Sequence, residues 1–137
     1  MKAIYLCFLV IGISLLTACS PGHQMAFKQL KTDHSGPVLS VQGYVLEMDE
    51  KKQGLITKWK AVAKEMSQQP GFIACYLSPG IGSSNLWLAH SKWDSLDLLR
   101  GAFSNPKVLA VESKMPKTQF EHLFSLGNKG SVVHKDE

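Results

Sequence analysis

The chain has 137 residues, enough for one domain of ordinary size. Hydrophobic residues make up 45% of it and charged residues 19%, a balance typical of a folded globular chain and not of a disordered one. The formal net charge is +4, and the lysines are scattered from Lys28 to Lys135, so the sequence predicts no nucleic-acid-binding surface.

The N-terminus has the features of an export signal. Lys2 is followed by a nearly continuous apolar run, Ala3–Leu16, which is shorter than the roughly 20 residues of a membrane-spanning helix. The run ends in Leu16-Thr17-Ala18-Cys19, which resembles the lipobox of bacterial lipoproteins. The resemblance implies that residues 1–18 are a cleaved signal peptide and that Cys19 carries the lipid, including palmitate. An ordinary cleaved signal and an uncleaved anchor remain as alternatives.

The cysteines and the polar segments suggest how the rest of the chain is organised. Cys7 would leave with the signal and Cys19 would be lipidated, so Cys75 remains and no disulfide is expected within the domain. Residues 19–37 are polar and predict a lipid-anchored tether, whereas residues 127–137 predict a polar tail. No aspartate follows the lipobox cysteine, which implies the periplasmic face of the outer membrane if the cell is Gram-negative.

The segment from residue 38 to residue 71 predicts a strand, a helix and a turn. Alternating apolar and small residues predict a strand over Val38–Met48. Lys51–Gln69 is predicted to be a helix capped by Asp49, because its apolar residues recur at helical spacing. That stripe consists of Leu55, Trp59, Val62, Ala63 and Met66. Gln69-Pro70-Gly71 ends the helix, since proline cannot donate a hydrogen bond and glycine can adopt a positive φ.

The second half predicts a hairpin, two helices and a last strand. Phe72–Leu77 and Asn85–Trp93 are predicted to pair across the short turn between them. Asp94 or Ser95 can cap the next helix, and Asn105-Pro106 starts a shorter one. Gln119–Leu126 is the predicted fourth strand.

The predicted element order is β-α-β-β-α-β. This is the ferredoxin-like split βαβ arrangement of the α+β class, a four-stranded antiparallel sheet with helices on one face. The domain should cover residues 38–126. Because one sheet face would be left bare, we expect two copies to pair as a homodimer.

Two stretches of the sequence resemble the antibiotic biosynthesis monooxygenase (ABM) domain family. One runs from Trp59 to Phe72 and contains Gln69-Pro70-Gly71-Phe72, and the other is Trp93-Asp94-Ser95-Leu96 with Ala102-Phe103 beyond it. The resemblance covers about residues 38–125 and implies a dimeric α+β barrel, in which two ferredoxin-like sheets pack face to face.

The family includes cofactor-free oxygenases of phenols and quinols, haem-degrading enzymes and members without known activity. The haem-degrading branch has an asparagine on the first strand, a tryptophan in the second helix and a histidine in the next helix. Here Val38–Met48 has no asparagine, and Ala102 and Glu112 stand near the other two places. The comparison argues against haem cleavage, and no cofactor or metal is expected.

Cofactor-free oxygenation needs a dry pocket and a group that takes a proton. His90 and His122 are the candidate catalytic residues, each with the alternative of a partly exposed strand histidine. The candidate pocket residues, which could equally be packing residues, are Tyr44, Tyr76, Asn85 and Trp87. Two hypotheses therefore stay open. One is an envelope-anchored, cofactor-independent monooxygenase acting on a small aromatic or quinol, and the other is a non-catalytic dimeric lipoprotein that binds a ligand or a partner.

Overall fold

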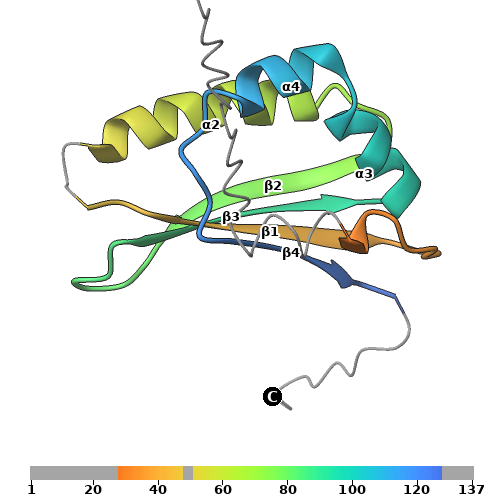
Figure 1. Cartoon of the computed structure of the whole chain (residues 1–137), viewed down its shortest axis with the longest axis horizontal. Coiled ribbons are helices and arrows are strands. Elements are labelled where there is room, and N and C mark those ends of the chain that lie inside the picture. The colour runs from red at the N-terminus through yellow and green to blue at the C-terminus, as the bar shows by residue number, and fades with distance from the viewer. Residues whose placement is uncertain (1–27, 48–50, 128–137) are drawn as a thin grey trace, which may run out of the picture.

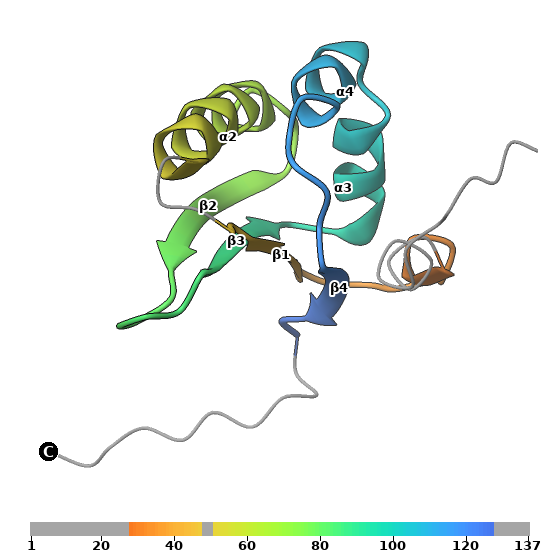
Figure 2. The ribbon, with the colours of Figure 1, turned by 60° about the vertical axis from the view of Figure 1, so that its left-hand side comes forward.

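The computed structural model describes residues 28–47 and 51–127. These residues form a four-stranded antiparallel sheet in the order β2-β3-β1-β4, with three helices on one face (Figures 1 and 2), which confirms the predicted fold class. In chain order the elements are β1 (Val38–Val45), α2 (Lys52–Met66), β2 (Phe72–Pro79), β3 (Leu86–Trp93), α3 (Leu96–Phe103), α4 (Pro106–Glu112) and β4 (Phe120–Ser125).

The local signals at the element ends act largely as the sequence predicts. The Ser95 side chain caps α3 by accepting a hydrogen bond from the Leu98 N–H at 3.2 Å. Gly71 has φ +79°, and a Cβ there would lie 2.4 Å from Leu98 Cδ1, so this turn requires glycine. The predicted cap Asp49 lies outside the described residues; Lys51 occupies the N-cap position of α2 and makes no side-chain cap hydrogen bond.

The register of β1 divides the sheet into two faces. Ser40, Gln42 and Tyr44 lie opposite Ser91, Ala89 and Trp87 of β3, on the side covered by the helices. The alternate residues of β1 lie on the other side, which the described helices leave uncovered (Figure 2). We call this second side the open face; it carries Leu39, Val41, Gly43, Val45, Leu86, Leu88, His90, Lys92, Phe120, His122 and Phe124.

The core between helices and sheet consists of two adjoining clusters. One surrounds Trp93, which is fully buried and donates its indole N–H to Ser91 Oγ at 2.9 Å. The other surrounds Tyr44 and includes Leu55 and Trp87. Met115, which follows α4, packs against both clusters and so closes the core where α4 leads into β4.

The end of the predicted tether packs on the domain. The Gln29 side chain donates to the Leu123 carbonyl at 3.0 Å and accepts from the Leu123 N–H at 2.8 Å. The Arg100 guanidinium of α3 donates to the backbone carbonyls of Leu30 and Thr32. Residues 29–32, which fall within the predicted lipid-anchored tether 19–37, are therefore held against β4 and α3 (Figure 2). The physical reason is that β4 is an edge strand whose free backbone groups need partners.

Within the described ranges, every helix is too short or too polar to cross a bilayer.

Candidate functional site

The two histidines predicted to be catalytic lie on the open face of the sheet. His90 of β3 and His122 of β4 both pair with Val41 of β1, one from each side. They therefore share one cross-strand row and stand two strand spacings apart, about 9.5 Å along the sheet. The Tyr76 ring of β2 stacks on the His90 ring at a centroid distance of 5.0 Å and extends the same row.

The four predicted pocket residues are not brought together. Tyr76 lies on the open face, and Asn85 is exposed in the loop before β3. Tyr44 and Trp87 lie opposite each other on the helix-covered face, both buried. Of the four, Tyr44 lines a cavity between sheet and helices.

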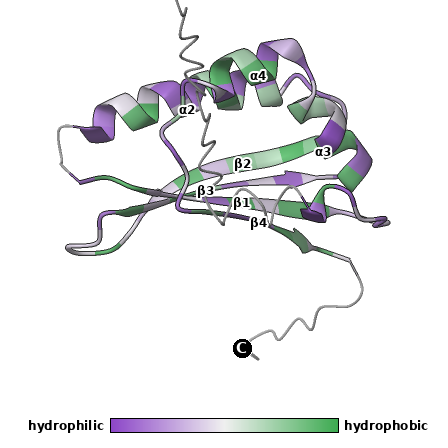
Figure 3. Cartoon of the chain, viewed as in Figure 1, coloured by the Kyte–Doolittle hydropathy of each residue, from purple (hydrophilic) through white to green (hydrophobic). Residues whose placement is uncertain are grey.

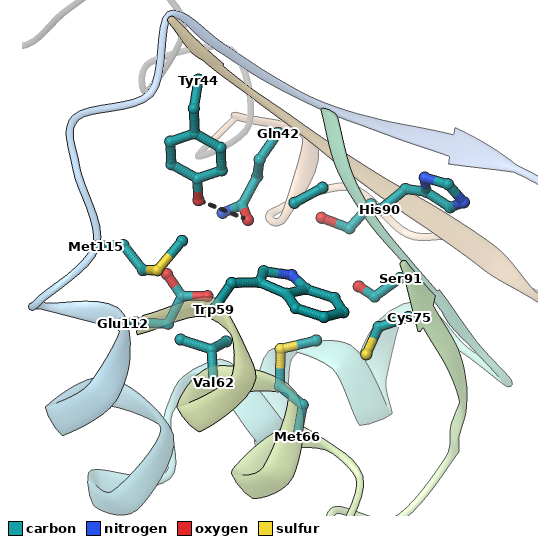
Figure 4. Close-up of a pocket in the computed structure, with 12 residues that line it drawn as sticks. Gln42, Tyr44, Trp59, Val62, Met66, Cys75, His90, Ser91, Glu112 and Met115 are labelled. Atoms are coloured by element: carbon teal, nitrogen blue, oxygen red, sulfur yellow. Dashed lines mark hydrogen bonds between the residues drawn. The ribbon is translucent and has the colours of Figure 1, made fainter. Parts of the chain in front are cut away.

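That cavity lies under α2 and α4 (Figure 4). It is lined by Ser40, Gln42, Tyr44, Trp59, Val62, Met66, Cys75, Ala89, His90, Ser91, Glu112 and Met115. His90 borders it from β3, but Figure 4 shows its imidazole pointing away from the other lining side chains. The free volume of about 10 Å³ corresponds to room for one water molecule, so the cavity is closed to larger molecules in this conformation.

A half-buried carboxyl group is the most unusual feature of the cavity. Glu112 is the last residue of α4 and points toward Tyr44 and Trp59 (Figure 4). Burial and the neighbouring negative charge of Glu121 raise the pKa of Glu112 to about 7, because both disfavour its ionised form. At neutral pH this group can therefore exist both as a proton acceptor and as a proton donor.

Glu112 is not among the site residues predicted from the sequence. The signal that could have found it is its spacing: it follows the fully buried Val108 by four residues, one helical turn, and so shares its inward face. A glutamate on an apolar helical stripe is uncommon unless the carboxyl has a role or a partner.

Hydrogen bonds connect the polar groups around Glu112 into a short chain. The Tyr44 hydroxyl donates to Gln42 Oε1 at 3.2 Å, and Gln42 Nε2 donates to Glu121 Oε1 at 3.1 Å. Burial, followed by the charges of Glu112 and Glu121, raises the pKa of Tyr44 far above its ordinary value, so its phenol stays neutral. We call Gln42, Tyr44, Glu112 and Glu121 the carboxyl–tyrosine cluster.

The opposite side of the cavity is formed by small polar residues and a thiol. Ser40 and Ser91 pair across β1 and β3 and are both buried. Cys75 of β2 pairs with Ser91, and burial raises the pKa of its thiol, which keeps it in the less reactive protonated form. In the parts of the chain that the structure describes, no three His, Cys, Asp or Glu side chains are grouped as a metal site.

The sequence matches no protein-family model and no curated protein. Solved structures do resemble the chain. SnoaB from Streptomyces nogalater, described as a cofactor-independent oxygenase, matches with a TM-score of 0.60 at 17% identity, over 69% of this chain and 97% of SnoaB. The chain has the ferredoxin-like fold of the ABM proteins.

Two further structures, both assigned to the antibiotic biosynthesis monooxygenases, support the same conclusion. The protein from Caulobacter crescentus has a TM-score of 0.59 at 12% identity, over 69% of this chain and 92% of its own. The protein from Deinococcus radiodurans has a TM-score of 0.58 at 15% identity, over 71% of this chain and 99% of its own. At such identities the ABM likeness establishes the fold, and the chemistry has to be argued from the residues.

Proposed function

We propose that this protein is an envelope-anchored lipoprotein whose ABM-like domain is a cofactor-independent monooxygenase for a small phenol or hydroquinone. The observation that carries the proposal is Glu112, a carboxyl group at a small cavity between sheet and helices with its pKa raised to about 7. General bases work best when their pKa lies near the working pH. The similarity to SnoaB supports the reaction class, because that protein is itself described as a cofactor-independent oxygenase.

In the proposed reaction Glu112 accepts the proton of the substrate hydroxyl. The resulting anion supplies the electrons that reduce O₂, so no separate reductant is required. For a phenol with an unsubstituted para carbon, one O₂ is consumed; one oxygen atom becomes the new carbonyl of a quinone and the other leaves as water. The protein's part is to take up the proton, orient the ring and exclude bulk water.

Ligand entry requires the cavity to open. Trp59 is half-buried at the cavity, and the side chains of Met66 and Met115 complete that side. Methionine side chains are unbranched and change rotamer readily, so they can move aside for a ring and reclose over it. A cavity that fills only when substrate enters would keep water away from the reacting anion.

We further propose that the open face is covered by a second copy of the chain. Most of its residues are apolar, and Phe124 at its edge is 51% exposed in the single chain. Figure 3 shows hydrophobic residues, in green, along the strands. An apolar sheet face of this kind favours a partner. His90 and His122 would then lie between two sheets, on the opposite side of β1 and β3 from Glu112; their catalytic role stays a prediction.

The proposed lipid on Cys19 would hold the domain close to a membrane. Eight residues, 20–27, separate Cys19 from the first described residue, Lys28. Even fully extended, this segment spans at most about 30 Å. The docking of residues 29–32 on β4 and α3 therefore supports a domain that stays near the bilayer surface.

Oxygen uptake with a panel of phenols and hydroquinones tests the activity, with ¹⁸O₂ used to follow oxygen into the product. We expect Glu112→Gln to lower turnover by about 100-fold or more, since it removes the proton acceptor. Glu47→Gln, which removes an exposed carboxylate just after β1, is the matched control and should retain turnover. His90→Ala and His122→Ala test the earlier assignment. Absence of turnover across the panel, or full turnover in Glu112→Gln, would contradict the proposal.

The closed cavity favours one alternative, a non-catalytic dimeric lipoprotein that binds a ligand or partner. A free volume of about 10 Å³ leaves no room for an aromatic ring without rearrangement. Under this alternative, no aromatic compound would cause oxygen uptake, whether or not it binds. The ¹⁸O₂ measurement separates the two functions.

A further inference from the structure

We propose that Gln42 and Glu121 are specificity-determining residues. They fix the direction of the Tyr44 hydrogen bond. As a result, the cavity binds reduced aromatic ligands, which carry hydroxyl groups, in preference to their oxidised forms, which carry carbonyl groups. The choice of ligand rests on the proposed function, and the geometry comes from the carboxyl–tyrosine cluster.

The direction of the hydrogen bonds follows from what each group can do. The Gln42 amide nitrogen, which can only donate, donates to Glu121 Oε1 at 3.1 Å. The amide carbonyl of Gln42 then faces Tyr44 and can only accept. The one hydroxyl proton of Tyr44 is therefore committed to Gln42.

The commitment of that proton decides what Tyr44 offers a ligand. Tyr44 lines the cavity, and its phenolic oxygen keeps lone pairs that can accept a hydrogen bond. Glu112, on the α4 side of the same cavity, is also an acceptor once it is ionised. At pH 8 this end of the cavity consequently presents two acceptors.

A hydroquinone or phenol can donate its O–H to these acceptors, whereas a quinone carbonyl would bring its own lone pairs against them. Burial makes such a mismatch costly, because water cannot enter to satisfy the groups. Ser40 and Ser91 on the other side can donate or accept and do not discriminate between the two forms. The same mismatch would favour release of a quinone product after turnover.

Anaerobic equilibrium dialysis at pH 8 with tetramethylhydroquinone and tetramethylquinone tests this inference. The two compounds share one carbon frame, and every ring carbon is substituted, so the quinone cannot add to the Cys75 thiol. We expect the hydroquinone to bind at least about tenfold more tightly. Tyr44→Phe should lower the ratio of the two affinities without removing the preference, because Glu112 remains as the second acceptor. Glu121→Gln should also lower it, because an amide no longer dictates the orientation of Gln42.

Tyr76→Phe is the matched control, since it removes the same hydroxyl from the open face of the sheet. It should leave the affinity ratio as in the unchanged protein, and thermal unfolding shows whether each variant is folded. Equal affinities in the unchanged protein, binding of neither compound, or a ratio that Tyr44→Phe leaves intact would each overturn the inference.

The outcome is separable from that of the proposed function. A tenfold preference without any oxygen uptake would support the cavity's selectivity and reject the monooxygenase. Oxygen uptake with equal affinities for the two compounds would support the monooxygenase and reject the cavity's selectivity.

Discussion

Replacing Glu112 by glutamine should make the protein more stable at pH 8 while lowering its proposed turnover by about 100-fold or more. Glutamine has nearly the same shape as protonated glutamate but cannot ionise. In the folded protein the pKa of Glu112 is raised from 4.5 to about 7, so the folded state holds its proton more tightly than the unfolded state does.

The sign of the effect follows from proton binding. Between pH 4.5 and pH 7 the folded state binds more protons at this site, so the free energy of unfolding falls as pH rises through that window. A tenfold change in proton affinity corresponds to about 1.4 kcal/mol. Above pH 7 the raised pKa of Glu112 therefore lowers the free energy of unfolding by about 3 kcal/mol, and we call this loss the penalty. Glu112→Gln removes that penalty, so it should stabilise the domain by up to about 3 kcal/mol at pH 8 and by very little at pH 4.

Urea unfolding at pH 4 and pH 8 measures both values. For a domain of this size, about 3 kcal/mol corresponds to a rise in Tm of roughly 10 °C or more. Glu47→Gln removes an exposed negative charge and separates the effect of net charge from that of burial. An equal change in stability at the two pH values, or destabilisation at pH 8, would refute a buried carboxyl with a raised pKa.

Three further predictions concern access, docking and anchoring. Cys75 should react slowly with iodoacetamide in a protein lacking residues 1–19, and Trp59→Ala should speed this reaction about tenfold by opening the cavity. Equal reaction rates in the two proteins would contradict a closed cavity. Gln29→Ala should lower the free energy of unfolding by about 2 kcal/mol, measured in urea, because Leu123 loses both of its backbone partners there; no change would show that this docking is weak. Cys19→Ser should abolish labelling by radioactive palmitate and move the protein out of the membrane fraction, whereas persistent labelling would exclude this lipidation site.

The fold was largely predictable because periodicity and turn chemistry act locally. The helical stripe of Leu55, Trp59 and Val62 and the positive φ of Gly71 each depend on a few neighbouring residues. The strand order then follows from the β-α-β-β-α-β succession, since short connections allow few arrangements. The docking of Gln29 on β4 was not predictable in this way, because it joins residues 94 positions apart through a single side chain.

The location of the site was harder to predict for a related reason. Alternation correctly groups His90 with Leu86 and Leu88 on one side of β3. Both sides of the sheet mix apolar and polar residues, however, so the pattern does not say which side the helices cover. Tyr76 and Tyr44 therefore look equally suited to a pocket in the sequence, yet the structure puts them on opposite faces.

The energetic penalty at Glu112 is itself an argument about function. A small domain is stable by only about 5–15 kcal/mol, and this one group removes about 3 kcal/mol of that at neutral pH. A glutamine of the same shape would avoid the loss. Glu112 weakens the fold and has a pKa near 7. A role in proton transfer or ligand recognition explains this combination better than a role in stabilising the fold. Glu112→Gln tests this cost, because a structural role predicts loss of stability at pH 8 and a raised pKa predicts a gain. Loss of oxygen uptake in the same variant would then support the chemical role.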